Sequence, residues 1–452
     1  MLAHSFKIDH EKCKGKLSCM RACPTRAIRV KKGKAKVLPD LCIDCGACMK
    51  VCPSEAILPN THSLEQVGNF KYKVAVPSPV LFAHFPMEVS PAHVIEGLRS
   101  LGFDSVCLFP VEASLVNRAI REYMEKWKGR YPIISSACPV IVRLIHVSYP
   151  GMIEQLVPVY PPRELASREI KLRLSKKLGI PKDQIGAIYI TSCQAKTIST
   201  IESAEGTRSN IDGAIGISDV YNGILTARYQ NQKKEHDQKS LLKELFHDQQ
   251  MLRWSLAKSQ QTNLHGYRYL SLTGLSNVIR VFEDIEKGKL RNLEFLECYA
   301  CWAGCVNGNL TVDNFYVTRH KLQRLIADLP EKDPRVEFEV ERRYPNTNFY
   351  GRADIKLDPL KSDMEHIKQR IKRIKQAESV AATLPGLDCG LCGSPNCRTL
   401  AIDIASGESR KRDCIFYSKD RLEKLKKMHL DYYVYSDVGA FKIGRKREKP
   451  AD

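Results

Sequence analysis

Fifteen of the seventeen cysteines in this 452-residue chain fall into three groups, and grouped thiols are well suited to binding metals. Seven lie between residues 13 and 52, four in the central part of the chain, and four between residues 389 and 414. Only Cys107 and Cys298 lie outside the groups. Residues 1–10 show no basic segment followed by an apolar one, so we expect no secretory signal. Cytosolic thiols stay reduced, and the pattern therefore predicts a cytoplasmic metalloprotein rather than a disulfide-bonded one.

The N-terminal group contains the strongest single signal. Its second half reads Cys42-x2-Cys45-x2-Cys48-x3-Cys52-Pro53, the run of bacterial ferredoxins, whose fourth cysteine binds the neighbouring cluster. The first half contains Cys13, Cys19 and Cys23 but has Lys16 where another cysteine is expected. By this crossover rule Cys42, Cys45, Cys48 and Cys23 complete one 4Fe-4S cluster.

The other N-terminal site is one thiolate short, because only Cys13, Cys19 and Cys52 remain for it. It holds a 3Fe-4S cluster, a 4Fe-4S cluster with a non-thiolate ligand, or no cluster. Two zinc sites are a weaker alternative, since zinc prefers paired C-x-x-C units that bring four ligands together.

The C-terminal group has the spacing C-x2-C-x4-C-x16-C, formed by Cys389, Cys392, Cys397 and Cys414. Glycines between these cysteines let the backbone approach a metal closely. The motif resembles the small 4Fe-4S domain of corrinoid iron-sulfur proteins and electron-transport complexes, with a structural zinc site as the alternative. An amphipathic helix that begins near a capping box at residues 362–365 precedes it.

The central cysteines each follow an apolar run that is typical of a strand. Residues 132–134 precede Cys138, residues 185–190 precede Cys193, and residues 293–296 precede Cys301 and Cys305. Open α/β sheets bind ligands at the carboxyl ends of their strands, so these thiols are expected to converge there. Buried structural thiols are the alternative.

Three short motifs contain these cysteines: S-S-A-C-P at 135–139, T-S-C-Q-A-K at 191–196 and E-C-Y-A-C-W-A-G-C-V-N-G at 297–308. They resemble the three cluster-binding signatures of the FeFe hydrogenase catalytic domain. The resemblance implies that Cys138, Cys193, Cys301 and Cys305 hold a 4Fe-4S cluster. It also implies that Cys305 bridges to a two-iron unit with CO and cyanide, the H-cluster, that Lys196 donates to a cyanide, and that Ser78 borders the two-iron unit.

The chain departs from this family where protons would move. The resemblance implies that productive hydrogenases have a cysteine that passes protons where this chain has Ala137. It also implies that they have methionines where this chain has Thr191 and Tyr299. Their acidic relay would fall near Asn117 and Ile120, which cannot carry a proton at neutral pH. Cys298 either replaces this relay or is an inert buried thiol. The resemblance is therefore to the sensory branch of the family, in which slow turnover accompanies hydrogen binding.

The expected organisation has five segments. Residues 1–65 form an α+β ferredoxin-like module with two clusters, and residues 70–350 form an α/β FeFe-hydrogenase domain with alternating strands and helices. Residues 351–380 form a linking helix, residues 381–415 a small α-rich 4Fe-4S module, and residues 416–452 a basic tail.

The formal charge of +20 does not by itself indicate nucleic acid, because clusters and their thiolates carry negative charge that offsets part of it. No nucleic-acid-binding signature accompanies the basic residues. We therefore do not expect nucleic acid as a partner. No run approaches the ~18 apolar residues of a membrane helix, so we do not expect a membrane as a partner either.

We interpret the chain as an FeFe hydrogenase that binds hydrogen and slowly and reversibly oxidises it or reduces protons, as a hydrogen sensor. Its expected partners are H2, protons, a redox partner such as ferredoxin, hydrogenase maturation proteins and a separate signalling protein, since no PAS domain is expected; a homodimer is a further option. The alternative is a non-catalytic iron-sulfur protein, similar to hydrogenase-like factors of cluster assembly or an electron relay, that holds only a cubane at the central cysteines. Lys196 would have no use without a cyanide, which favours the H-cluster.

Overall fold

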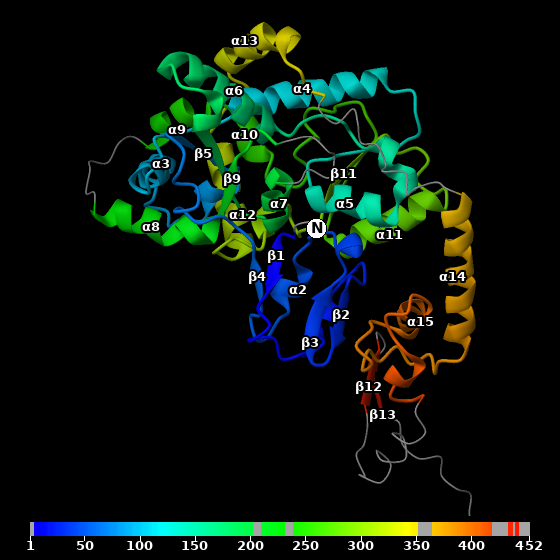
Figure 1. Cartoon of the computed structure of the whole chain (residues 1–452). Helices are drawn as coiled ribbons and strands as arrows, with labels where there is room; N and C mark the ends of the chain where they lie inside the picture. Colours follow the sequence, from blue (N-terminus) through cyan, green and yellow to red (C-terminus); the bar gives the residue numbers. More distant parts are fainter. Residues whose placement is uncertain are drawn as a thin grey trace, which may run out of the picture. The chain divides into compact units, whose positions relative to one another are not determined.

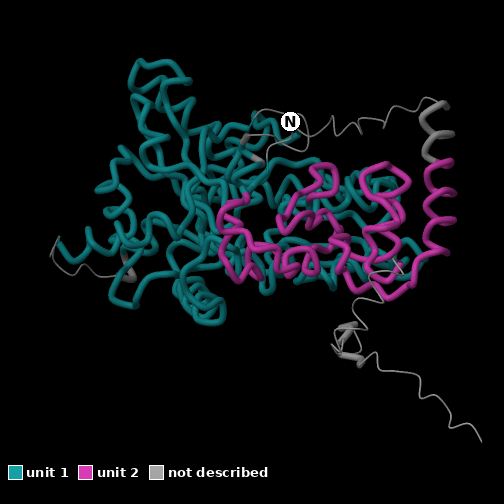
Figure 2. Tube along the Cα trace, turned by 60° about the horizontal axis from the view of Figure 1, so that its bottom comes forward, with its two compact units in different colours: residues 1–7, 43–46, 59–356 teal, residues 8–42, 47–58, 357–452 magenta. Residues whose placement is uncertain are grey.

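The computed structural model describes residues 4–201, 209–230, 238–350, 364–417, 433–436 and 439–442. The chain divides into two units, drawn in two colours in Figure 2. Unit 1 comprises residues 1–7, 43–46 and 59–356, and unit 2 comprises residues 8–42, 47–58 and 357–452. Within the described ranges, every helix is too short or too polar to cross a bilayer.

Two parallel sheets form the centre of unit 1 (Figure 1). The first has the order β6-β5-β8-β9, with β5 at Tyr72–Pro77, β6 at Ser105–Val106, β8 at Ile185–Thr191 and β9 at Gly213–Gly216. All seven residues of β8 are buried, as expected for an inner parallel strand that is covered on both faces. The second sheet has the order β10-β11-β7, with β7 at Ile133–Ile134, β10 at Tyr269–Thr273 and β11 at Phe295–Tyr299.

Helices connect and cover these strands. Those before β8 are α3 (Pro91–Ser100), α4 (Pro110–Lys126), α5 (Pro139–Ser148) and α6 (Pro162–Leu178). After β8 come α7 (Gln194–Ile201), α8 (Ile217–Gln230), α9 (Gln238–Phe246), α10 (Gln250–Arg253), α11 (Leu275–Glu286), α12 (Phe315–Ala327) and α13 (Pro334–Arg343). α6 ends at Gly179, whose φ of +68° favours glycine. The parallel strands with helical crossovers give the α/β architecture expected for this part of the chain.

Unit 2 contains most of the N-terminal module and the C-terminal module. The N-terminal module has α1 (Ser18–Arg21), α2 (Ala47–Lys50), a β1–β4 pair (Phe6–Ile8 with Ile57–Pro59) and a β2–β3 pair (Ile28–Lys31 with Lys34–Val37). The C-terminal module has α14 (Met364–Ala382), which packs along α15 (Cys397–Ala405), and an antiparallel pair of β12 (Tyr433–Ser436) and β13 (Gly439–Lys442).

The two ends of the chain meet inside unit 2. Val30 donates its backbone N–H to the carbonyl of Gly393 (2.9 Å), and the Lys31 ammonium donates to the Ser409 hydroxyl (2.9 Å). Gly393 has φ +83°, and a Cβ there would lie 1.8 Å from the Val30 carbonyl oxygen, so only glycine allows this contact. The two modules that carry the outer cysteine groups are therefore packed against each other.

The expected fold class is confirmed: a ferredoxin-like α+β module, an α/β domain and a small helical module. Residues 238–253 form the two helices α9 and α10, which are separated at His247, whose φ of +60° cannot continue a helix. The expected capping box at 362–365 lies largely outside the described residues, as does most of the basic tail at 416–452.

Candidate metal centres

The strand ends of unit 1 position the central cysteines. Cys138 follows β7 and is the N-cap of α5, Cys193 lies between β8 and α7, and Cys301 and Cys305 follow β11. β7 and β11 run parallel in one sheet, and β8 runs parallel to its neighbours in the other. The cysteines thus all leave the carboxyl ends of parallel strands, as the sequence predicts.

Close backbone contacts bring the Cys193 and Cys305 loops together. Leu310 donates its N–H to the carbonyl of Ser192 (3.1 Å), and a Cβ on Gly308 would lie 1.9 Å from that same oxygen. The Thr191 hydroxyl accepts from the Cys193 N–H (3.1 Å) and holds the turn after β8. Thr191, which stands where a methionine was expected from the family, therefore has a structural role in this loop.

The thiols of Cys138, Cys193 and Cys305 lie close enough to influence one another. Burial raises the pKa of Cys138 to about 11, and the neighbouring Cys193 and Cys305 add to the increase. Burial and Cys305 also raise the pKa of Cys193, against the opposing effect of Lys196. Buried thiols that repel one another are unfavourable unless a metal takes their charge. Together with Cys301 on the same loop as Cys305, this donor set fits a 4Fe-4S cluster.

Lys196 lies directly beside one of these thiols. Its ammonium donates to Cys305 Sγ at 3.3 Å, and the residue is only 7% exposed. Burial alone would lower the pKa of Lys196, but Cys305, Tyr189 and Cys193 together outweigh burial and raise it above the usual value. The Lys196 ammonium therefore binds a thiol of the protein itself. A cyanide ligand is then not required to explain a lysine at this position.

A small cavity of about 30 Å³ lies next to Cys305. The residues that line it include Ala137, Lys196 and Cys305. Tyr299, which stands where the family has a methionine, and Pro79, which follows Ser78, also line it. Three further aromatic side chains, Phe109, Tyr189 and Trp254, and the cation Arg163 complete most of the wall. The sequence patterns did not single out these four residues, because none of them lies within one of the three cysteine motifs.

Other predicted residues do not form part of the cavity wall. Ser78 is fully buried and binds Ile190 O through its backbone N–H (2.8 Å). Cys298 is 1% exposed on β11, within the apolar cluster that contains Ile134 and Leu296, and burial raises its pKa well above the usual value. Asn117 donates its side-chain amide to Gln250 (3.0 Å), and Ile120 packs in an apolar cluster of α4. None of these four is among the described residues that line the cavity.

A buried carboxylate is hydrogen-bonded to the cavity residue Tyr299 and was not anticipated. Glu297 is 1% exposed and accepts hydrogen bonds from Tyr299 Oη (3.0 Å), Ser271 Oγ (3.1 Å) and Lys258 N (2.9 Å). Ser259 and Tyr269 also donate to it. Strand alternation explains why Glu297 and Tyr299 share this network while Cys298 faces the apolar cluster.

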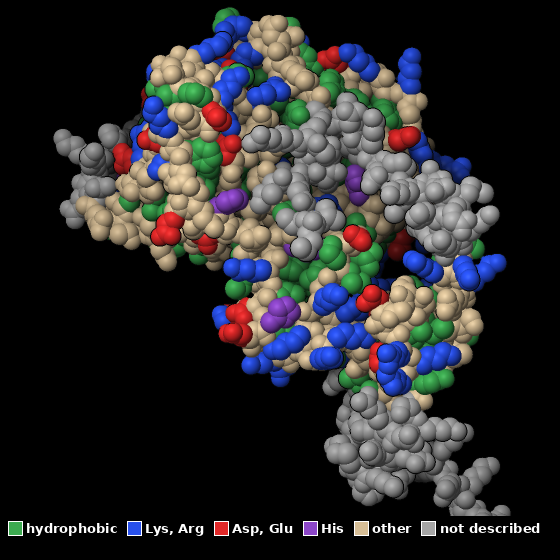
Figure 3. Space-filling model, in the orientation of Figure 1, with side chains coloured by type: hydrophobic (Ala, Val, Ile, Leu, Met, Phe, Trp, Pro, Cys, Tyr) green, Lys and Arg blue, Asp and Glu red, His purple; other side chains and the backbone are tan. Residues whose placement is uncertain are grey.

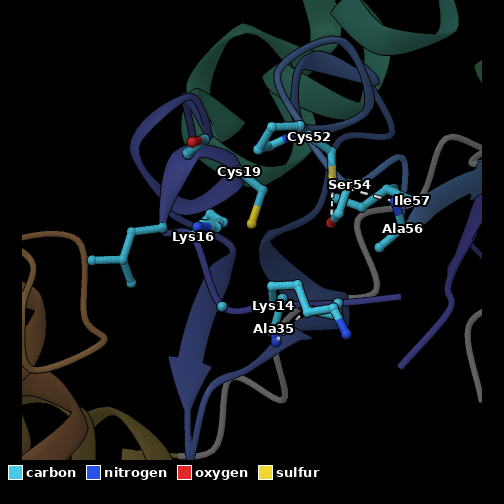
Figure 4. Close-up of a pocket in the computed structure, with 13 residues that line it drawn as sticks. Lys14, Lys16, Cys19, Ala35, Cys52, Ser54, Ala56 and Ile57 are labelled. Carbon is cyan, nitrogen blue, oxygen red and sulfur yellow. Dashed lines mark hydrogen bonds between the residues drawn. The ribbon is translucent and has the colours of Figure 1, made fainter. Parts of the chain in front are cut away.

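Cys13, Cys19 and Cys52 line one pocket of about 20 Å³ in unit 2, with Lys14, Lys16 and Ser54 around them. Figure 4 shows the sulfurs of Cys19 and Cys52 facing the same space, with Lys16 beside Cys19. Burial raises the pKa of Cys19, and Cys52 and Cys13 add to the increase. Among the described residues that line this pocket, Cys13, Cys19 and Cys52 are the cysteines.

In each half of the N-terminal module, a cysteine sulfur accepts a hydrogen bond from the backbone N–H four residues later. Cys52 Sγ accepts from Ala56 N (3.3 Å) and lies 3.6 Å from the Ser54 hydroxyl, while Cys23 Sγ accepts from Ala27 N (3.1 Å). Burial opposes ionisation of Cys52, but hydrogen bonds from Ser54 and Ala56 outweigh it and lower its pKa. Such donors stabilise the thiolate that a cluster requires.

All four C-terminal cysteines, Cys389, Cys392, Cys397 and Cys414, line one cavity of about 10 Å³. The Asp388 carboxylate accepts from Cys397 N (2.7 Å), and the Asn396 side chain caps α15 at Thr399 N (2.8 Å). Burial raises the pKa of Cys389, and Cys397 and Cys414 contribute. Four thiols around a common centre fit a tetrahedral thiolate site, as a cubane or zinc needs.

Basic side chains surround the N-terminal module. Lys12, Lys14, Lys16, Lys32, Lys34 and Lys36 are exposed, and Figure 3 shows Lys and Arg gathered over this part of the drawn face. The Lys34 ammonium donates to the carbonyl of Cys13 (2.9 Å), so part of this charge lies next to the three-thiolate site.

Three family models match the chain. Residues 71–244 and 209–309 match the model described as "Iron only hydrogenase large subunit, C-terminal domain". Residues 5–55 match a 4Fe-4S dicluster domain, and residues 384–416 match an Fe-S cluster model. The protein is thus a hydrogenase-like iron-sulfur protein.

The curated relatives are described as Fe-S cluster assembly factors, whereas the family model is named after a hydrogenase. A "Probable cytosolic Fe-S cluster assembly factor" of Drosophila ananassae is 21% identical over 318 residues, which cover 59% of this chain and 64% of that protein. The protein of the same description from Drosophila virilis is 22% identical over 331 residues, covering 60% of this chain and 68% of the relative. The match thus spans about two thirds of the length of these relatives.

Among solved structures, a variant of FeFe-hydrogenase HydA1 from Chlamydomonas reinhardtii matches with 17% identity and a TM-score of 0.46, over 63% of this chain and 94% of that one. The matched segments of the first family model run together from residue 71 to residue 309, more than half of the 452 residues. This chain therefore belongs to the family of the iron-only hydrogenase large subunit, C-terminal domain.

Proposed function

We propose that this protein is a non-catalytic iron-sulfur factor that carries cubanes and transfers electrons in Fe-S cluster assembly, and that it does not turn over hydrogen. The observation that carries the proposal is the cavity beside Cys305. Its wall has Ala137 at the position where a proton-carrying side chain is expected, and the large aromatic side chains of Tyr299 and Trp254 stand beside Cys305.

The residues around the cavity support the same conclusion. Tyr299 and Trp254 occupy space next to Cys305, and both are large, rigid side chains. Ala137 presents only a methyl group to the cavity, so it cannot accept or release a proton there. A cubane at Cys138, Cys193, Cys301 and Cys305 needs neither this space nor a proton path, because electron transfer moves no atoms.

The names of the curated relatives favour this reading, because they are described as cytosolic Fe-S cluster assembly factors. We extend that role, and the cytoplasmic location, to this chain as part of the proposal. The exposed lysines near Cys13 would suit an acidic redox protein as electron donor or acceptor, since opposite charges speed up encounter. Clusters in the N-terminal and C-terminal modules, which are packed together in unit 2, would then form the entry for electrons.

A hydrogen-sensing hydrogenase is the second candidate, because one observation favours it. Lys196 is buried with its ammonium 3.3 Å from Cys305 Sγ, where it could also donate to a ligand of a neighbouring iron. The same lysine neutralises the Cys305 thiolate in a cubane-only protein, so this contact alone does not separate the two candidates.

Infrared spectroscopy after maturation separates them. The chain would be produced together with the hydrogenase maturation proteins, and a productive FeFe hydrogenase from the same cells would serve as the positive control. We expect no CO or cyanide bands in this protein and no hydrogen evolution. CO and cyanide bands at an intensity comparable to the control would overturn the proposal in favour of the sensor.

The cubane itself is tested with two serine variants. Cys305→Ser removes a predicted ligand, and Cys298→Ser changes a buried thiol seven residues earlier on the same segment. We expect iron content and the paramagnetic resonance signal of the central cluster to fall in the first variant only. Equal loss in both variants would mean that Cys298 is a ligand and that our ligand set is wrong.

A further inference from the structure

The loop from Cys13 to Cys19 keeps the backbone conformation of a cluster-binding loop although it lacks a cysteine. It has the same spacing as the loop from Cys42 to Cys48, so that Lys16 stands at the position of Cys45. The residues before and after this position have positive φ in both loops: +61° at Gly15 and +54° at Asp44, and +64° at Leu17 and +72° at Gly46. Lys16 therefore occupies the backbone position of a ligand.

This conformation is held in place although it is unfavourable at one residue. Leu17 has a Cβ, which disfavours a positive φ, and residues held in this way are often found at functional sites. A Cβ on Gly15 would lie 2.6 Å from the carbonyl oxygen of Gly33, so the two backbones are in close contact. Lys34 Nζ also donates to the carbonyl of Cys13 (2.9 Å). The backbone around residue 16 is therefore fixed as if for a ligand.

The side chains at this position supply positive charge in place of a thiolate. Lys14 and Lys16 are exposed and line the same pocket as Cys13, Cys19 and Cys52 (Figure 4). A lysine ammonium has three N–H donors and no lone pair that could bind iron. Among the described residues that line the pocket, none is acidic. The two ammonium groups are therefore available to an anion that enters the pocket from solution.

A cubane held by three thiolates leaves its fourth iron without a ligand from the protein. Thiolate is the ligand type that iron-sulfur clusters prefer, so a thiol from solution suits this iron best. The two lysines add a second requirement, because ammonium groups form charge-assisted hydrogen bonds with carboxylates. A small molecule that has both a thiol and carboxylates meets both requirements.

We propose that the site of Cys13, Cys19 and Cys52 binds a small acidic thiol, with its thiolate on the fourth iron and its carboxylates on Lys14 and Lys16. The thiol loses its proton to solvent as the iron–sulfur bond forms, so no oxidant or reductant is consumed. The inference rests on the proposed function in one respect, that these three thiols carry a cluster. The infrared test after maturation concerns the central cysteines, so the two proposals fail separately.

Glutathione, which has one thiol and two carboxylates, is the probe, and 2-mercaptoethanol is the uncharged comparison. The full chain would be reconstituted anaerobically with iron and sulfide, oxidised mildly to the three-iron form and freed of small thiols. One equivalent of ferrous iron enriched in the Mössbauer-active isotope then labels the fourth position, so the Mössbauer spectrum reports on that iron. We expect both thiols to change this spectrum at one molecule per chain, and glutathione to do so at lower concentration.

Lysine variants identify the carboxylate contacts. Lys14→Gln together with Lys16→Gln should raise the glutathione concentration at half-saturation by about 4- to 25-fold, from roughly 2- to 5-fold for each exposed charge pair. The concentration of 2-mercaptoethanol at half-saturation should not change, because this thiol has no carboxylate. Lys32→Gln together with Lys36→Gln is the matched control. It removes the same charge at exposed residues that are not among the described residues lining the pocket.

The wild type provides a second measurement if the lysine variants lose their cluster. Glutathione binding should weaken as salt is raised, because salt screens exposed charges, whereas 2-mercaptoethanol binding should not. An unchanged spectrum with glutathione, equal affinity for both thiols, or the same loss in the control variant would each overturn the proposal.

Discussion

Arg29 and Asp403 form a buried ion pair between segments that are 374 residues apart. Arg29 Nε donates to Asp403 Oδ2 (2.6 Å) and its Nη2 donates to Oδ1 (2.8 Å), and both side chains are at most 9% exposed. Ser394 also donates to Asp403 Oδ2 (2.7 Å). Two parallel hydrogen bonds fix the angle between β2 and α15, so the pair fixes the position of the C-terminal module on the N-terminal one.

We predict that Asp403→Asn destabilises unit 2 by about 3–5 kcal/mol, because it leaves the Arg29 charge buried without its partner. Glu341→Gln, which breaks the exposed pair with Arg118, should cost less than ~1 kcal/mol. Anaerobic urea unfolding, followed by the visible absorption of the clusters, measures both. A similar small effect of the two substitutions would mean that the Arg29–Asp403 pair does not hold the modules together.

Lys16→Cys should complete the three-thiolate site of Cys13, Cys19 and Cys52. We expect the wild type to give a three-iron or site-differentiated signal in Mössbauer and paramagnetic resonance spectra, and the variant to give an additional four-thiolate cubane. Lys14→Cys is the control, since Lys14 lines the same pocket but lies outside the ferredoxin spacing. If Lys14→Cys has the same effect, or if the wild type already shows two all-cysteine cubanes, the ligand spacing that we infer is wrong.

Lys196→Met should make the reduction potential of the central cluster more negative. Removing a positive charge 3.3 Å from Cys305 Sγ disfavours the added electron, and we expect a shift on the order of 60 mV, equivalent to a tenfold change in the equilibrium. A redox titration monitored by paramagnetic resonance measures it. Lys171→Met removes a charge that is paired with Asp212 away from the cysteines and should leave the potential unchanged.

His84 should make the protein less stable in mild acid. Burial lowers its pKa from 6.5 to about 4; Asp313 opposes this decrease and Lys321 adds to it. On lowering the pH, His84 of the unfolded chain takes up a proton near pH 6.5, whereas His84 of the folded protein takes it up only near pH 4. The stability of the folded protein is therefore highest above pH 6.5 and falls as the pH decreases from 6.5 to about 4.

At about 1.4 kcal/mol per pKa unit, the full loss amounts to about 3 kcal/mol. His84→Gln should remove this part of the pH dependence, which anaerobic unfolding at pH 7 and pH 5 would detect. Thr318→Val, which removes the hydroxyl 3.5 Å from His84 Nδ1, should cost the same at both pH values. A pH dependence that is unchanged in His84→Gln would exclude this histidine as its source.

The sequence alone determined those features that depend on local spacing. The run from Cys42 to Cys52, the pattern of the C-terminal cysteines and Lys16 at the position of a missing cysteine are spacings along the chain, so candidate ligand sets could be predicted without a fold. The apolar segment before Cys193 also indicated its strand correctly, because an inner parallel strand is buried on both faces.

The tertiary structure decided everything that depends on packing between distant segments. Arg163 shows no motif, and only the placement of α6 beside the Cys305 loop makes it a wall of the cavity. Lys196 was assigned to a cyanide from its motif, whereas the fold gives it a thiolate partner 109 residues away. The size of the cavity and the pairing of Arg29 with Asp403 likewise arise from side chains that meet only after folding, and no local pattern records which distant residues will meet.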